Sequence, residues 1–434
     1  MAKAETMPDI ELEPMEATPL YRHSFFSEEM RESRKQLTAT LILPLVYTSL
    51  LMWACLSLYW ASLLPSNNLN KLTVVAVDLD HGFLGAQVMQ GIQGAASPSP
   101  DHLNWIIGDG ITSSADSESV VLDEQAWAVV QVSPNASSSL DEALRAGDAS
   151  YNPLSAVSIY AATARNQITA NSHVIPAILA IVNPLLNKAG AIHTAQFLGT
   201  VSNNSSALQT ALHCPQCIAS PYAANQTDFR PFDSPTASAS TMVGLIFLLT
   251  FAFSIFQTLR TVGLVIGSKM NLRSALVFRT VNALLAYFVI SLWYTLINLA
   301  FGVPMGRYFG HGGFVIYWML NWMTMAAVGL PLESLFTVIG MKWAGYFLSF
   351  WIIVNVASAF TSFELMPGFF QYGYGFPFFN SIQGARTIIF GTKNHLGRNF
   401  GILIAWMIIG LLGVYLFTFL QLRANRRAGS HHIL

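Results

Sequence analysis

The chain contains 434 residues, of which 53% are apolar and only 10% are charged. Soluble globular domains carry about 25% charged residues, so this deficit argues against an ordinary soluble protein and indicates one embedded in a membrane. The formal net charge of -1 provides no basic surface of the kind that binds nucleic acid. The length exceeds that of one ordinary domain, so we expect two structural units.

The N-terminal part predicts a membrane anchor. Residues 1–36 are polar and of mixed charge, so we expect a mostly disordered cytoplasmic tail. Residues 37–64 form an apolar run that exceeds the roughly 20 residues needed to cross a bilayer. The length of this run and its acidic leader distinguish it from a cleaved signal peptide. We interpret it as a signal anchor and as the first transmembrane helix, with a kink at Pro44.

Residues 65–239 have the composition of a water-soluble domain. Short runs rich in valine and alanine predict strands, and each of the first two is followed by a helical pattern. The predicted strands cover residues 70–80, 126–132 and 154–162. A long helical stretch follows at 163–199, interrupted by Pro176 and Pro184. Strands that alternate with helices predict a small α/β domain between the first and second membrane helices.

Residues 240–422 predict a domain of five further transmembrane helices, which gives about six in the chain. The apolar spans cover residues 242–259, 275–300, 314–332, 344–360 and 400–420. A last tail, residues 423–434, carries several arginines. The fold class is therefore an α-helical polytopic membrane protein that carries an α/β domain.

Basic residues and glycosylation motifs predict the orientation. The loop after the second span carries Arg260, Lys269, Arg273 and Arg279, and the positive-inside rule places it and both termini in the cytoplasm. The α/β domain then lies outside the cytoplasm, with the plasma membrane as the expected location. In agreement, every Asn-x-Ser/Thr acceptor for N-linked glycans lies in that domain, namely Asn135, Asn203, Asn204 and Asn225.

Acidic residues are rare after residue 240, where only Glu333 and Glu364 occur. Ionisable groups at membrane depth are costly and often line a pathway. Glu364 lies at the outer end of the fifth span, and we expect it to form an outer gate with Arg386. Glu333, at the inner end of the fourth span, is expected to be solvated at the interface.

Residues 364–398 predict a broken outer hairpin, because the segment 366–380 is aromatic and rich in glycine and proline. An ordinary belt of aromatic residues at headgroup level is the alternative interpretation.

The sequence contains no phosphate-binding loop, zinc-protease motif or nucleophile elbow. We therefore predict no enzyme, no cofactor and no metal. Asp78, Asp80 and His81 form a possible cation site, but we favour Asp80 as the cap of the following helix. Cys214 and Cys217 have the spacing of a redox pair or of half a zinc site, yet a structural disulfide fits an oxidising compartment better.

Several blocks resemble the fungal nitrosoguanidine-resistance membrane proteins, from about residue 35 to 422. They include SLYWASLL, LTVVAVDLDHGFLG, RAGDASYNP, NQTDFRPFDSPTASASTMVGLIFL and MPGFFQYGYGFPFFNSIQGARTIIFGTKNHLGRNFGIL. That family in turn is similar to the membrane subunits of ABC-2 type exporters, which share a first helix, a large outer domain and five further helices.

The resemblance implies a protein that exports toxic small molecules, or confers resistance to them, in part through the distribution of membrane lipids. By position, the loop from Arg260 to Arg279 corresponds to the coupling loop on which such subunits dock their ATPase. Arg386 corresponds to the basic residue after their outer hairpin. Because this chain has no nucleotide-binding domain, a separate ATPase or flippase is the expected partner, and the analogy also implies a homodimer.

Two alternatives to transport follow from the same residues. The missing energy source favours a membrane organiser that does not transport, or an accessory subunit of a separate flippase or efflux pump. An enzyme of the outer domain, built on Asp78, Asp80 or His81, is the remaining alternative.

Overall fold

The computed structural model describes residues 24–63, 68–96, 99–266 and 270–427. The chain forms two compact units, Met1–Ala54 and Cys55–Leu434, which we describe separately. In the first unit, helix α1 (Arg31–Leu51) begins before the predicted residue 37, so the end of the expected tail is helical. Residues 1–23 of that tail, and residues 428–434 of the C-terminal one, lie outside the described residues.

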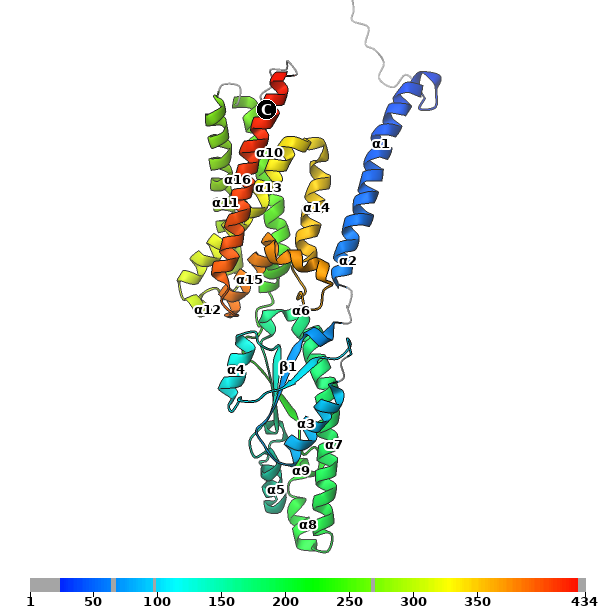
Figure 1. The fold of residues 1–434 in the computed structure, drawn as a ribbon, viewed down its shortest axis with the longest axis vertical. Coiled ribbons are helices and arrows are strands. Elements are labelled where there is room, and N and C mark those ends of the chain that lie inside the picture. Colours follow the sequence, from blue (N-terminus) through cyan, green and yellow to red (C-terminus); the bar gives the residue numbers. More distant parts are fainter. Residues whose placement is uncertain (1–23, 64–67, 97–98, 267–269, 428–434) are drawn as a thin grey trace, which may run out of the picture. The chain divides into compact units, whose positions relative to one another are not determined.

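The α/β domain of the second unit is built on a mixed five-stranded sheet of order β2-β1-β3-β4-β5 (Figure 1). Strand β3 is parallel to β1 and antiparallel to β4, while β2 and β5 pair in parallel with β1 and β4. The strands are β1 (Thr73–Asp78), β2 (Asn104–Ile107), β3 (Ala128–Val132), β4 (Val157–Ala161) and β5 (Ala224–Asp228). Strands β2 and β5 were not predicted from the sequence.

Helices cover both faces of this sheet. Val74 and Ala76 of β1 belong to a core shared with α3, α5 and α7, whereas Val75 and Val77 face a smaller core against α4. This alternation is the two-residue period of a strand that is buried on both faces. The helices are α3 (Phe83–Ala95), α4 (Ser114–Leu122), α5 (Ala136–Ala146), α6 (Gln167–Thr169), α7 (Ile175–Val201), α8 (Ser205–Ala211) and α9 (Pro215–Ala219).

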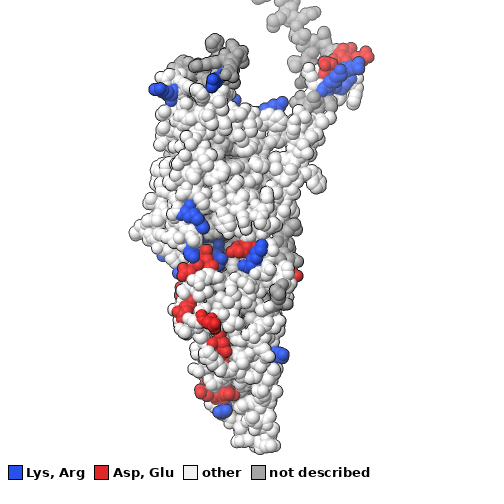
Figure 2. All heavy atoms as spheres, viewed as in Figure 1, with Lys and Arg blue, Asp and Glu red and all other residues white. Residues whose placement is uncertain are grey.

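The helix bundle follows the α/β domain in the chain. It comprises α10 (Gly244–Ile266), α11 (Leu272–Ala300), α12 (Gly306–Phe309), α13 (Gly312–Ile339), α14 (Ala344–Ala357), α15 (Pro377–Phe390) and α16 (Leu396–Arg427), with the short α2 (Ser57–Leu63) packed against α14. Helix α13 is buried over most of its circumference and contacts α10, α11, α15 and α16, so it forms the centre of the bundle. Figure 2 shows few charged atoms on the visible side of the bundle between its two ends.

Helices α13 and α16 approach each other closely at Gly410. A Cβ atom at this position would lie 2.6 Å from the Cβ of Leu330 and 2.7 Å from the backbone nitrogen of Pro331. The absence of a side chain at Gly413 allows a similarly close approach to Ser334. Small residues at such points allow helix backbones to pack tightly within a membrane.

Among the described residues, six helices are long and apolar enough to cross a membrane, which supports a multi-pass membrane protein. These six helices are not the same as the six predicted transmembrane spans. The stretch Gln167–Val201 qualifies by composition, whereas the expected fifth span at 344–360 is a helix that ends at Ala357. With the preceding turn this helix covers Met341–Ala357, about 25 Å at 1.5 Å per residue.

Helix α7 belongs to the α/β domain despite its hydropathy. Ile178, Val182 and Leu186 are buried in the core beneath the sheet. Further along the helix, the Nε2 of His193 lies 3.0 Å from the Asp141 carboxylate of α5. One face of α7 is therefore buried in the core that it shares with α3 and the sheet.

Candidate functional site

Two cavities lie at opposite ends of the bundle. The first, which we call the junction cavity, has a volume of about 180 Å³ and lies where the α/β domain meets the loops after α14 and before α16. Its polar lining includes Glu124, Arg165, Glu364, Tyr374, His395 and Arg398. Helix α16 begins beside this cavity with Arg398 and reaches the second cavity with Thr418. Twenty residues of helix separate the two cavities by about 30 Å, the thickness of the hydrocarbon core of a bilayer.

Arg165 is the central side chain of the junction cavity. Its guanidinium lies 3.9 Å from the centre of the Trp127 ring, donates to the Ala126 carbonyl at 3.1 Å and pairs with Glu364 at 3.4 Å. Burial lowers the pKa of Arg165, and the Glu124 and Glu364 carboxylates oppose this effect. The side chain joins the α/β domain, through Trp127 and Ala126, to the bundle, through Glu364.

The structure connects the predicted gate residues through Arg165. Glu364 forms its ion pair with Arg165, and Arg386 donates from Nη1 to the Arg165 carbonyl at 3.1 Å. Among the described residues no ion pair joins Glu364 to Arg386. Arg386 is only 2% exposed, and burial lowers its pKa to about 10, so its guanidinium is protonated at neutral pH. Arg165 was not predicted as a site residue, although it is a lone arginine at the start of an apolar stretch.

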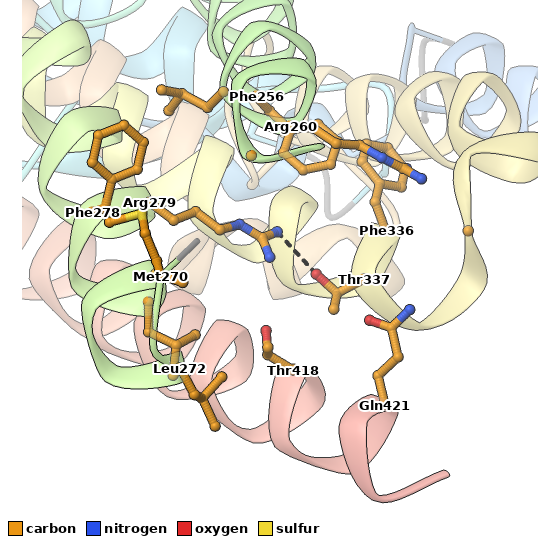
Figure 3. Close-up of a pocket in the computed structure, with 15 residues that line it drawn as sticks. Phe256, Arg260, Met270, Leu272, Phe278, Arg279, Phe336, Thr337, Thr418 and Gln421 are labelled. Carbon is orange, nitrogen blue, oxygen red and sulfur yellow. Dashed lines mark hydrogen bonds between the residues drawn. The ribbon is translucent and has the colours of Figure 1, made fainter. Parts of the chain in front are cut away.

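The second cavity, which we call the Arg260 pocket, has a volume of about 110 Å³ and lies between the ends of four helices. Apolar side chains form most of its wall, including Phe256, Met270, Leu272, Phe278 and Phe336. In Figure 3, Thr337 and Gln421 approach from α13 and α16, and Arg279 of α11 extends towards Thr337. The Arg279 Nη2 donates to the Thr337 hydroxyl at 3.0 Å.

The predicted coupling loop contributes to this pocket only in part. Arg260 and Arg279 line the pocket, whereas Arg273 is exposed and does not. Lys269 lies outside the described residues. Arg260 forms no ion pair with any described residue, so its charge is free to meet a ligand.

Glu333 differs from its expected solvated role. It is 1% exposed and forms an ion pair with Arg279, and its Oε2 has no hydrogen-bond partner among the described residues. The expectation failed because α13 lies at the centre of the bundle, so the end of this helix stays covered. A buried pair of this kind is costly to break, because it leaves one uncompensated charge.

The acidic residues of the α/β domain contact backbone groups. The Asp78 Oδ1 accepts from the N–H groups of Asp80 and His81 at 2.9 and 3.1 Å. Asp80 accepts from the N–H groups of Gly85 in α3 at 3.3 Å and of Ser137 in α5 at 2.9 Å, so it satisfies N–H groups at the start of both helices, although Gly82 and not Asp80 occupies the N-cap position of α3. No group of three or more metal-binding side chains occurs in the described part of the chain.

Two further groups of predicted residues lie in the same domain. Cys214 and Cys217 form a disulfide with a Cα–Cα distance of 5.4 Å, and both are buried. The side chains of the predicted glycan acceptors are exposed, namely Asn135, Asn203, Asn204 and Asn225.

The comparison with known families covers both cavities. The family described as "Protein of unknown function (DUF3533)" matches residues 44–412. The chain belongs to this family. The DUF3533 match includes the α/β domain, the whole junction cavity and all but the last residues of the Arg260 pocket.

A relative of this DUF3533 chain is an uncharacterized endoplasmic reticulum membrane protein of Saccharomyces cerevisiae. It is 24% identical over 97% of this chain and 87% of its own length. No solved structure matches the chain.

Proposed function

We propose that this protein binds amphipathic molecules in its helix bundle and moves them across or out of the membrane. Resistance to toxic small molecules, through export or through altered lipid distribution, would follow from this activity. The observation that carries the proposal is the Arg260 pocket, whose wall is mostly apolar and which includes Arg260, a guanidinium without an ion pair among the described residues. An apolar tail with an anionic head matches both parts of the pocket.

The chemistry of the α/β domain favours transport over catalysis. Asp78 and Asp80 hold backbone N–H groups, so neither is positioned as a free base. We therefore propose no enzymatic activity. The chain has no nucleotide-binding loop, so movement against a gradient would require a separate ATPase or flippase. A second copy of the chain is the other partner that we propose.

Substitution of Arg260 tests the proposal. Cells that lack the protein, and cells that carry Arg260→Gln, are expected to accumulate more of a labelled alkylating compound than wild-type cells. The loss of a charge-assisted contact costs about 1.5–3 kcal/mol, which corresponds to about tenfold or more in affinity. Arg423→Gln is the matched control, because Arg423 is an exposed arginine near the end of α16 that lines neither the pocket nor the predicted coupling loop.

Equal accumulation in all these cells, with resistance still lost on deletion, would reject export of that compound. The protein would then act as a membrane organiser or an accessory subunit. Co-purification with a flippase or an efflux pump would support this alternative, which is motivated by the scarcity of acidic residues after residue 240, where only Glu333 and Glu364 occur.

We also propose that the α/β domain lies on the non-cytoplasmic side, with both termini in the cytoplasm. The lumen of the endoplasmic reticulum is topologically equivalent to the cell exterior, so this orientation applies in either membrane. The location printed for the yeast relative favours the endoplasmic reticulum over the plasma membrane expected above.

Enzymatic removal of N-linked glycans tests the orientation. It is expected to increase the electrophoretic mobility of the wild-type protein, because all four acceptor asparagines are exposed. A variant with glutamine at these four positions should already migrate at the faster position. An unchanged mobility of the wild-type protein after treatment would contradict the proposed orientation.

A further inference from the structure

We propose that the junction cavity binds a zwitterion that carries a primary ammonium and an oxyanion. A free amino acid and the headgroup of an aminophospholipid share this chemistry. The inference goes beyond the proposed function, because this cavity lies at the other end of the bundle from the Arg260 pocket and requires no transport.

Charges of both signs face the junction cavity. Glu124 and Glu364 contribute carboxylates, and Arg165 and Arg398 contribute guanidinium groups. The buried Arg386 adds a third positive charge directly behind Arg165. A ligand of one sign would be repelled by half of this lining, whereas a zwitterion satisfies both halves.

The carboxylates retain acceptor capacity for an ammonium group. The Glu364 Oε1 contacts Arg165 at 3.4 Å, and the Glu124 Oε2 contacts His395 at 3.5 Å. Both distances exceed that of a strong charge-assisted hydrogen bond, about 2.7–2.9 Å. An ammonium group with three donors can therefore contact both carboxylates more closely than their present partners do.

Arg398 is the group that we assign to the oxyanion. It is exposed on the first turn of α16 and forms no ion pair among the described residues. Arg165, by contrast, is held by Trp127, Ala126 and Glu364. The planar guanidinium of Arg398 matches a carboxylate or phosphate with two parallel hydrogen bonds.

The aromatic side chains explain why we propose a primary ammonium. A quaternary ammonium is usually bound by open aromatic faces. Here the Trp127 face is covered by Arg165, and Phe363 packs against Tyr374 at 4.2 Å and Phe379 at 4.6 Å between ring centres. The cavity therefore offers hydrogen-bond acceptors rather than an aromatic cage.

Calorimetric titration of the full-length protein tests the inference. The protein is reconstituted in nanodiscs whose lipid is phosphatidylcholine, a lipid without a primary ammonium, and titrated with glycine, glycerophosphoethanolamine or glycerophosphocholine. We expect glycine, glycerophosphoethanolamine or both to bind, and glycerophosphocholine to bind about tenfold more weakly or not at all, a difference of ~1.4 kcal/mol. Binding of glycine indicates a free amino acid as the source, and binding of glycerophosphoethanolamine alone indicates a lipid headgroup.

Three variants locate the site. Glu364→Gln and Arg398→Gln should each weaken binding of the preferred zwitterion by about tenfold, again ~1.4 kcal/mol. Arg307→Gln is the matched control, because Arg307 pairs with Asp233 at 2.9 Å outside the cavity. The melting temperature without ligand is measured for each variant, so a loss of folding is distinguished from a loss of binding. The inference is overturned if no zwitterion binds, or if all three variants bind like the wild type. Neither outcome affects the Arg260 test.

Discussion

Replacing Arg279 with leucine is expected to destabilise the bundle by about 3–5 kcal/mol, the range found when one partner of a buried ion pair is removed. The substitution would leave Glu333 buried at 1% exposure without its cation. It would also remove the donor to the Thr337 hydroxyl. The measurement is the thermal unfolding of the detergent-solubilised protein, followed by the fluorescence of its tryptophans.

Two further variants separate the buried charge from other effects. Arg273→Leu removes an exposed arginine of the same helix and should change stability little. The double variant Arg279→Leu/Glu333→Leu removes both charges and should recover most of the loss, because apolar side chains can replace a buried ion pair. If Arg279→Leu lowers the stability no more than Arg273→Leu does, the buried ion pair does not stabilise the folded protein.

Replacing Asn166 with alanine should weaken the contact between the α/β domain and the bundle. This side chain is 4% exposed, accepts from the Thr169 N–H at 3.1 Å and donates from Nδ2 to the Phe360 carbonyl at 3.0 Å. The lost helix cap costs about 1 kcal/mol and the unsatisfied buried carbonyl about 1–3 kcal/mol. We expect a total loss of about 2–4 kcal/mol, measured by thermal unfolding, together with faster proteolysis of the connecting segments.

Asn271→Ala is the matched control for this variant. Asn271 caps α11 by accepting from the Ser274 N–H at 2.8 Å, but it is exposed and makes no contact with the α/β domain. This substitution should lower the free energy of unfolding by only about 1 kcal/mol, because it removes only the helix cap. Equal losses for the two variants would show that the bond to Phe360 contributes nothing to stability.

The sequence predicted the membrane character and the α/β domain because both depend on local patterns. Apolar runs of bilayer length and valine-rich strands are visible in any window of the chain. Strand β5 (Ala224–Asp228) was not predicted, because it is a polar edge strand with exposed Asn225 and Gln226. Hydropathy also identifies α7 as a candidate span, since composition does not reveal that one face of this helix packs in the core of the α/β domain.

The candidate sites depend on contacts between distant segments, which local patterns do not encode. Glu364 was expected to pair with Arg386, its neighbour in sequence, yet Arg165 lies closer in space. Glu333 was expected at the interface because it lies near the end of a span, and the central position of α13 buries it. In both cases the sequence identified the ionisable group, and only the tertiary structure identified its partner.

Helix α16 contributes residues to both cavities. It is a single helix from Leu396 to Arg427 that carries Arg398 at one cavity and Gln421 at the other. Between these ends, the missing side chain of Gly410 lets it rest directly on the backbone of α13. Because Gly410 and Gly413 both lie against α13, a side chain at either position would displace the helix that lines both cavities.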